Sequence, residues 1–367
     1  MKIKITKAAL SEVLNTVQTV VDGKSAVSIL QNVKIEAADG KAVFTCTNLD
    51  VTMIATAACE VVEAGQTTLP AKILSAIIGK AVDGIVDVSV DDKAKAKISA
   101  GTSRYNINGT DAASFPQLPE LTGESATLPV EVLREMLRKT SFAVSQDDTR
   151  RTFTGVLLDF ATDGITAVGT DGCRMSRYKV KASIPESFAK QYILPRKAVD
   201  VLKARLPKEG EVELTAVGAQ LKFKFGENAF ITKLIDNTYP NYNLVIPKSL
   251  AFEVEVDRDA LVGAIDRISV LSGIGEDQSV RIKFDANLVS LKAFADVVGD
   301  CTDEVPAKYD GDEIEMRLNP VYIKDVLNAL DEDVIKVKLN NGFSPAVITT
   351  TDDVDITYVI MPLRFNS

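Results

Sequence analysis

The chain has 367 residues, 46% of them apolar and 25% charged, which is the balance of a folded protein with two or three domains. It contains no histidine, which excludes Ser-His-Asp and Cys-His catalysis and histidine-ligated zinc. The four cysteines are far apart and offer no CxxC pair, and the net charge of -9 is the wrong sign for a protein that simply coats nucleic acid.

The first six residues alternate in the manner of a strand and lack the apolar stretch of a signal peptide. The sequence has no apolar run of about 20 residues that would predict a membrane span. We therefore expect a cytoplasmic protein.

An amphipathic helical pattern follows the first strand and recurs twice, at intervals of about 125 residues. The three copies begin near Lys7, Val130 and Arg258, and each has apolar residues at i, i+3, i+4 and i+7. A second helix also occurs three times and opens at Pro70, Pro195 and Pro320. Proline suits the first turn of a helix, where its missing N–H is not needed.

Each repeat ends on a similar dipeptide: Phe115-Pro116, Tyr239-Pro240 and Met361-Pro362. Short alternating segments such as 43–46, 221–225 and 289–293 lie between the helices and predict antiparallel strands. The chain therefore reads as an α+β protein of three domains, each with two helices on antiparallel sheets. We place the domains at residues 1–122, 123–248 and 249–367. The alternative is three duplicated domains with no shared role.

The six predicted helices carry a net positive charge, whereas the rest of the chain is strongly negative. This arrangement is expected where helices face a polyanion and the outside repels it. The alternative is that lysine and arginine are good helix formers on solvated faces.

Together with the repeat, two segments carry a family resemblance: Gly169–Met175, with its TDGxR turn, and the MPxR tail at 358–365. The chain resembles the bacterial sliding clamps, the beta subunits of the replicative DNA polymerase. The resemblance covers essentially the whole chain. It implies a DNA polymerase processivity factor without catalytic activity or cofactor, acting as a head-to-tail homodimer whose six domains form a ring around duplex DNA.

The resemblance also implies a partner-binding groove between the second and third domains, since an apolar groove with polar anchors suits a short hydrophobic peptide. Its residues would be Thr170, Gly172, Arg174, Met175, Pro240, Val245, Asn319, Tyr322, Val359, Met361, Pro362, Leu363 and Arg364. Without the resemblance, the tail would be interpreted as an ordinary edge strand. The implied partners are the replicative polymerase and an ATP-driven clamp loader, with repair polymerases, mismatch-repair proteins and ligase as further candidates.

The candidate DNA contacts are basic residues concentrated in the first two repeats. They are Lys24, Lys72, Lys80, Arg134, Arg138, Arg150, Arg151, Arg196, Lys197, Lys203 and Arg205. Candidate dimer contacts are Tyr105, Val270 and Leu271, which would otherwise complete the cores of their own domains.

Two other functions compete with the clamp. Asp147-Asp148, Asp352-Asp353 and Asp171 would suit a carboxylate-based metal hydrolase, but the doublets flank turns in which aspartate favours local backbone hydrogen bonds. A scaffold that binds peptides through the C-terminal groove, without DNA, is the second alternative. We predict no metal site.

Overall fold

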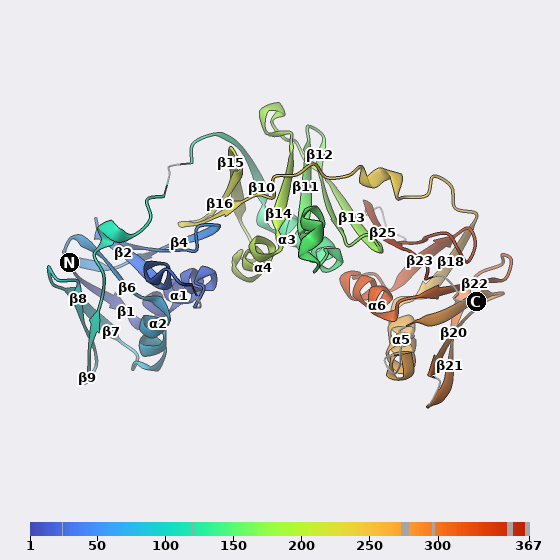
Figure 1. Ribbon diagram of the computed structural model, residues 1–367, viewed down its shortest axis with the longest axis horizontal. Coiled ribbons are helices and arrows are strands. Elements are labelled where there is room, and N and C mark those ends of the chain that lie inside the picture. Colours follow the sequence, from blue (N-terminus) through green and yellow to red (C-terminus); the bar gives the residue numbers. More distant parts are fainter. Residues whose placement is uncertain (24, 119–120, 273–278, 296–297, 351–354, 364–367) are drawn as a thin grey trace. The chain divides into compact units, whose positions relative to one another are not determined.

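The computed structural model describes residues 1–23, 25–118, 121–272, 279–295, 298–350 and 355–363. A similar order of strands and helices occurs three times, in blue to teal, green to yellow, and orange to red, with one additional short strand in the first repeat (Figure 1). By their contacts, the residues group into two compact units: Met1–Leu133 with Asp200–Leu234, and Arg134–Val199 with Ile235–Ser367. The division passes through two helices of the second repeat.

The first repeat contains two helices, α1 (Lys7–Val17) and α2 (Ala71–Lys80). Its strands are β1 (Lys2–Thr6), β2 (Asn32–Ala38), β3 (Lys41–Thr47), β4 (Val51–Ala58), β5 (Glu60–Glu63), β6 (Gly65–Pro70), β7 (Ile85–Val90), β8 (Lys95–Ala100) and β9 (Ser103–Asn108).

The second repeat contains α3 (Val130–Thr140) and α4 (Arg196–Arg205). Its strands are β10 (Glu124–Pro129), β11 (Gly155–Ala161), β12 (Gly164–Thr170), β13 (Arg174–Lys181), β14 (Gln191–Pro195), β15 (Glu211–Val217), β16 (Gln220–Phe225) and β17 (Asn228–Lys233).

The third repeat contains α5 (Arg258–Ser272) and α6 (Pro320–Ala329). Its strands are β18 (Phe252–Asp257), β19 (Val280–Asp285), β20 (Leu288–Ala295), β21 (Gly299–Lys308), β22 (Ile314–Leu318), β23 (Val334–Leu339), β24 (Ala346–Thr350) and β25 (Asp355–Ile360).

Polar side chains start three of the helices at the predicted places. Thr6 accepts the Ala9 N–H at 3.3 Å, Asp257 accepts the Ala260 N–H at 2.7 Å, and Asn319 accepts the Val321 N–H at 2.9 Å. Each cap satisfies a backbone donor that has no partner within the helix. The helices then bury their apolar faces, as α1 does with Leu10, Val13, Leu14 and Val17.

The repeated prolines differ from the prediction in one respect. Pro320 lies in the first turn of α6, but Pro70 and Pro195 are the last residues of β6 and β14. A strand end tolerates proline because no further ladder hydrogen bond is needed from its nitrogen. In these two repeats the proline therefore marks the change from strand to helix.

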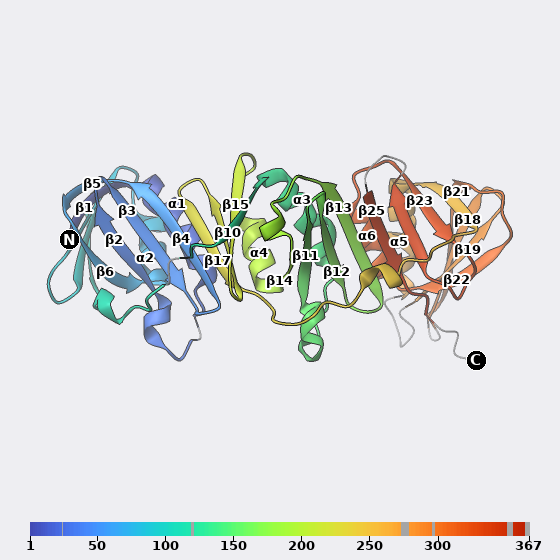
Figure 2. The ribbon, with the colours of Figure 1, turned by 90° about the horizontal axis from the view of Figure 1, so that it is seen from above.

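In the first unit, a sheet of the first repeat is fused to a sheet of the second. The eight strands run in the order β10-β15-β16-β17-β4-β3-β2-β6, and the fusion is the antiparallel pair of β17 and β4 (Figure 2). A separate five-stranded sheet has the order β5-β1-β7-β8-β9. Helix α1 contacts α2, β3 and β4, so the helices cover the sheet as expected.

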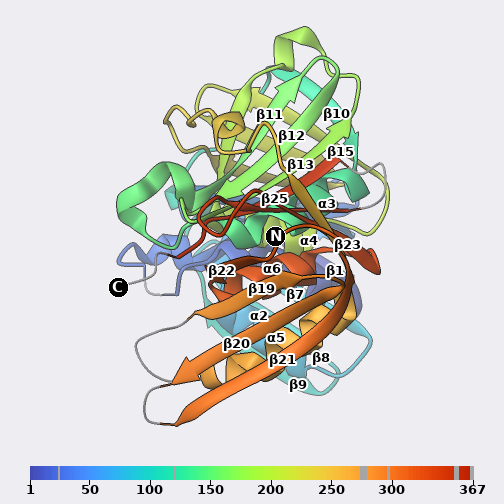
Figure 3. The same cartoon turned by 90° about the vertical axis from the view of Figure 1, so that its right-hand side faces the viewer.

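In the second unit, the fusion joins the second repeat to the third. Twelve strands run in the order β14-β11-β12-β13-β25-β24-β23-β18-β21-β20-β19-β22, with β13 paired to β25 (Figures 2 and 3). Helix α5 contacts α6, β18, β20 and β21 and contributes Leu261, Ala264, Ile265 and Ile268 to the core of the third repeat. The predicted α+β architecture of three repeats is confirmed.

A glycine at the end of β12 allows a close approach that no other residue permits. A Cβ added to Gly169 would lie 2.2 Å from the carbonyl oxygen of Thr140, at the end of α3. We therefore expect Gly169→Ala to destabilise the protein by about 1–3 kcal/mol, because backbone must move. Gly79→Ala on α2 is the control, because a Cβ added to Gly79 would have nothing within 4 Å. That change should stabilise the helix by about 1 kcal/mol. Thermal unfolding midpoints that move in the same direction for both variants would contradict this.

Candidate functional site

Residues Thr170–Arg174 form a tight turn between β12 and β13. Thr170 Oγ1 accepts the Gly172 N–H at 3.0 Å and donates to the carbonyl oxygen of Arg174 at 2.6 Å. Asp171 Oδ1 accepts the N–H groups of Cys173 and Arg174, each at 2.9 Å. Gly172 has φ 87°, in the left-handed region that favours glycine. The sequence of the turn thus fixes its backbone.

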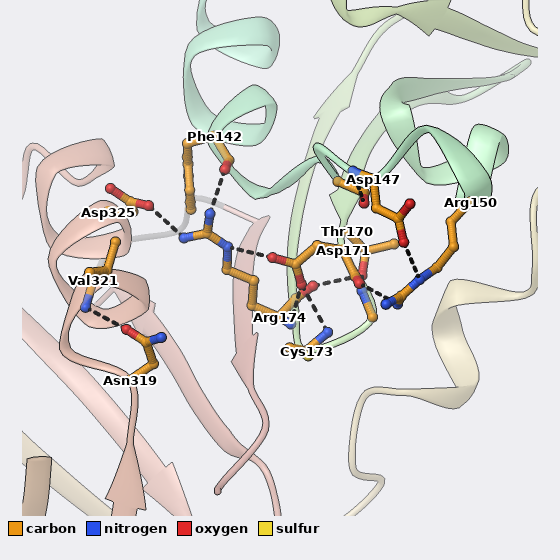
Figure 4. Close-up of polar contacts among 12 residues, drawn as sticks. Phe142, Asp147, Arg150, Thr170, Asp171, Cys173, Arg174, Asn319, Val321 and Asp325 are labelled. Atoms are coloured by element: carbon orange, nitrogen blue, oxygen red, sulfur yellow. Dashed lines mark hydrogen bonds and ion pairs between the residues drawn. The ribbon is translucent and has the colours of Figure 1, made fainter. Parts of the chain in front are cut away.

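The guanidinium of Arg174 ties this turn to two other segments (Figure 4). Its Nε donates to Asp171 at 3.1 Å, one terminal nitrogen to Asp325 on α6 at 2.6 Å, and the other to the Phe142 carbonyl at 2.8 Å. Its carbon lies 4.4 Å from the ring centroid of Tyr322, also on α6. The side chain is 10% exposed, so these charge-assisted bonds replace its lost hydration.

The C-terminal tail runs past the turn and is held at two points. The Met361 N–H donates to the Cys173 carbonyl at 2.9 Å, and the Leu363 N–H donates to the Arg317 carbonyl on β22 at 2.8 Å. In the pairing of β13 with β25, Met175 lies opposite Val359. The tail therefore starts as a strand and continues as one wall of the site.

A cavity of about 110 Å³ opens beside the turn and the tail. It is lined by Phe153, Thr170, Gly172, Arg174, Met175, Tyr239, Pro240, Asn241, Tyr242, Val245, Val359 and Met361. Met175 and Val359 are buried in its floor, whereas Val245 and Met361 are 45% and 40% exposed. An apolar floor with fixed polar groups at its edge suits a hydrophobic side chain of a ligand. We call this cavity the tail groove.

The tail groove brings together many of the predicted partner-binding residues: Thr170, Gly172, Arg174, Met175, Pro240, Val245, Val359 and Met361. Tyr322 reaches it through Arg174, and Asn319 caps α6. Pro362 and Leu363 continue the tail, and Arg364 lies outside the described residues.

Sequence reasoning missed Phe153, Tyr239, Asn241 and Tyr242. Tyr239 packs edge-on against Phe153 with ring centroids 6.0 Å apart, and Tyr242 Oη donates to Asp159 at 3.0 Å. Burial raises the pKa of both tyrosines, and the charge of Asp159 raises that of Tyr242 further, so both phenols stay protonated at neutral pH. The signal for Tyr239 was its place before Pro240; Phe153 offered none.

Comparison with known proteins identifies the whole chain. Family models of the DNA polymerase III beta subunit match in order: the N-terminal domain at residues 1–119, the central domain at 127–241 and the C-terminal domain at 243–364. The beta sliding clamp of Synechococcus elongatus is 32% identical, with both chains covered completely. The chain belongs to the DNA polymerase III beta subunit family.

Solved clamp structures agree. The sliding clamp of Bacillus subtilis has a TM-score of 0.96 at 27% identity, covering 100% of this chain and 99% of its own. A Pseudomonas aeruginosa clamp bound to griselimycin has a TM-score of 0.95 at 29% identity, with both chains fully covered. This clamp is thus a non-catalytic processivity factor whose family binds DNA and polymerase, and the hydrolase and scaffold alternatives are wrong.

The candidate DNA-binding residues of this clamp lie mainly on helices. Lys72 and Lys80 are on α2, Arg134 and Arg138 on α3, and Arg196, Lys197, Lys203 and Arg205 on α4, while Arg150 and Arg151 lie in the segment before β11. Lys24 is outside the described residues.

Arg138 and Arg150 illustrate basic side chains that are already engaged within the protein. Arg138 forms ion pairs with Glu135 and Asp331. Arg150 donates to the Asp171 carbonyl at 3.0 Å and lies 3.4 Å from Asp147. Both pairs compete with phosphate for the guanidinium groups.

The candidate dimer residues lie on two different elements. Tyr105 is on β9, at the edge of the five-stranded sheet. Val270 on α5 is 70% exposed, whereas Leu271 is partly buried and packs against the core of the third repeat. Of the two residues on α5, Val270 therefore has the more exposed apolar side chain that a partner could contact.

Two further observations concern the residues that the structure describes. Among them, no group of three or more Cys, Asp or Glu side chains could hold a metal ion. None of the described helices is long and apolar enough to cross a membrane.

Proposed function

We propose that the tail groove is the docking site of this clamp for the polymerase and for the clamp loader. The observation that carries this proposal is the apolar cavity between the turn at Thr170–Arg174 and the C-terminal tail, which two backbone hydrogen bonds hold in place. A peptide that places apolar side chains against Met175 and Val359 would remove them from water. Polar groups at the rim would set its direction.

Repair polymerases, mismatch-repair proteins and ligase would compete for the same groove. The protein would act in the cytoplasm. Several weak partners can share one groove because a clamp that stays on DNA raises their local concentration. We further propose domain boundaries at residues 1–122, 123–248 and 249–367.

Removal of residues 361–367 tests the groove. We expect a fluorescent peptide from the polymerase tail to lose at least about tenfold in affinity, because Met361 and the backbone bond to Cys173 are lost. A variant that lacks only residues 365–367 keeps every proposed contact and should bind normally. Wild-type affinity of the longer truncation, measured by fluorescence anisotropy, would disprove the site.

The pattern of strand pairs supports a head-to-tail ring. Strands β4, β13 and β21 occupy equivalent places in the three repeats, as do β9, β17 and β25. β4 pairs with β17, and β13 pairs with β25. In the described part of the chain, residues 299–306 of β21 pair with β20 alone, and β9 is an edge strand. We propose that β21 of one protomer pairs with β9 of its partner.

Apolar and charged groups beside these strands support the pairing. Val270, Phe294 and Val298 are 70%, 56% and 59% exposed near β20 and β21. Arg104 on β9 would meet acidic residues such as Asp300 on β21. Two such contacts related by the twofold axis of the dimer would close a ring of six domains.

Substitution at this surface should separate the protomers. We expect Val270→Asp combined with Phe294→Asp to give a folded monomer, because two carboxylates would have to be buried at each contact. Leu271 is left unchanged because it packs against the core. Val334→Asp, also at an exposed apolar position, is the matched control and should stay dimeric. A dimer mass for the double variant in sedimentation would refute the interface.

We also propose that DNA contacts the basic residues of the first two repeats through phosphates and not base edges. The third repeat adds little, because the charges of its two helices nearly cancel. Phosphate contacts are blind to sequence and weaken with salt, which suits a protein that slides. Retention then depends on the closed ring.

Three exposed cations of α4 test whether phosphate contacts supply affinity while the closed ring supplies retention. Changing Arg196, Lys197 and Lys203 to alanine should weaken direct DNA binding and reduce the slope of log K against log salt by up to about 2.7. A ring already loaded on nicked circular DNA should nevertheless remain there. Changing Lys93, Lys95 and Lys97, near and on β8, is the charge-matched control. If the α4 variant leaves closed circles as fast as linear DNA, retention is electrostatic and the encircling model fails.

A further inference from the structure

The turn between β3 and β4 in the first repeat duplicates the turn of the tail groove. Thr47 Oγ1 accepts the Leu49 N–H and donates to the Val51 carbonyl, each at 3.1 Å. Asn48 Oδ1 accepts the N–H groups of Asp50 and Val51, at 3.1 and 2.9 Å. Thr170 and Asp171 make the same bonds, atom for atom, at the equivalent turn of the second repeat.

The strand that passes this turn is duplicated as well. The Lys233 N–H donates to the Asp50 carbonyl at 2.8 Å, as the Met361 N–H does to Cys173. In the pairing of β17 with β4, Ile231 lies opposite Thr52, as Val359 lies opposite Met175. The first unit therefore carries the framework of a second groove, at the junction of the first two repeats.

A cavity of about 160 Å³ occupies this framework. It is lined by Thr47, Leu49, Thr52, Pro116, Gln117, Leu118, Leu121, Gln220 and Ile231. Most of these positions correspond to residues of the tail groove: Pro116 to Pro240, Leu118 to Tyr242, Leu121 to Val245 and Ile231 to Val359. We call this cavity the first-repeat groove.

At two positions the first repeat has an apolar side chain where the tail groove has arginine or glycine. Val51, which is buried, stands where Arg174 lies in the tail groove. Leu49 stands at the place of Gly172, with φ 76°, and its side chain is 53% exposed. A leucine in the left-handed region costs about 1–2 kcal/mol, and here it presents an apolar side chain at the rim.

Two lysines lie in a concavity that adjoins the first-repeat groove. The cavity shares Pro116, Gln117, Leu118, Leu121 and Ile231 with a wider concavity of about 850 Å³ that also contains Lys34 and Lys222. Lys34 is paired with Glu36 at 2.9 Å. Among the described residues, Lys222 has no ion pair, so it is available to an anion.

We propose that the first-repeat groove binds an extended segment of a client protein, with apolar side chains followed by carboxylates. The apolar side chains would lie against Leu49, Leu118 and Ile231, and the carboxylates would pair with Lys222. The inference rests on the proposed peptide-binding role of the tail groove, which has the same backbone frame. A client that occupies this groove would leave the tail groove open to a second one, so that two proteins could share one protomer.

The probe for this proposal is a fluorescein-labelled peptide of three leucines followed by three aspartates. We expect it to bind the wild-type dimer and to lose at least about fivefold in affinity with Leu49→Gly or with Lys222→Glu. Glycine adopts φ 76° without strain, so Leu49→Gly should keep the thermal midpoint of the wild type. Lys97→Glu on β8 makes the same charge change elsewhere and should bind as the wild type does.

The tail truncation separates this proposal from the tail groove. Loss of residues 361–367 should leave the leucine–aspartate peptide bound and release the polymerase-tail peptide, whereas Leu49→Gly should do the opposite. If the leucine–aspartate peptide does not bind, is insensitive to Leu49→Gly, or is released by the truncation, the first-repeat groove is not a docking site. A mass change with Leu49→Gly and no peptide binding would assign the surface to a second copy of this chain, which also overturns the proposal.

The two failures can be told apart. If the polymerase-tail peptide fails to bind the wild type, the proposed function of the tail groove falls. The response of the leucine–aspartate peptide to Leu49→Gly still decides the first-repeat groove in that case.

Discussion

Antiparallel pairing between strands of successive repeats is the constraint on which the rest of the structure depends. A strand at the edge of a sheet leaves a row of backbone N–H and C=O groups without partners, and such an edge tends to pair with another strand. β4 and β17 satisfy one such pair of edges, and β13 and β25 satisfy another. Because both fusions join different repeats, the contacts of the second repeat divide between two units. Both grooves lie beside such a fusion, where a turn, a paired strand and a linking segment meet.

Arg174 shows how one buried charge shapes a site. At 10% exposure its guanidinium has lost most of its hydration, and leaving it without partners would be costly. Asp171, Asp325 and the Phe142 carbonyl supply those partners from three segments. Their positions are thereby coupled, and the rim of the tail groove is fixed before any ligand arrives. The first-repeat groove has buried Val51 instead, so its turn is held by backbone bonds and by Thr47 and Asn48.

The sequence predicted the three repeats and the helices, because apolar periodicity and turn residues are local signals. The residues of the tail groove were expected only from the resemblance to the sliding clamps, since the residues alone favoured an ordinary edge strand for the tail. It did not predict Phe153 or Tyr242, since each reaches the groove through contacts distant along the chain. The fusion of the sheets could not be predicted for the same reason, because alternating residues predict a strand but not the strand with which it pairs. The likeness of Thr47–Val51 to Thr170–Arg174 was also hidden. The two segments share a threonine and an Asx residue, and only the hydrogen bonds reveal the match.

The distribution of charge fits a protein that holds DNA by topology. Two of the proposed phosphate contacts are instead paired with carboxylates: Arg138 with Glu135 and Asp331, and Arg150 with Asp147. If DNA binds as we propose, each such pair lowers the number of phosphates that are neutralised, and the affinity falls steeply with that number. A protein that depended on these contacts for retention would dissociate from DNA more readily because of these ion pairs. A closed ring does not depend on phosphate contacts for retention, because the proposed pairing of β9 with β21 of the partner would keep it on DNA, and strong phosphate contacts would slow its sliding.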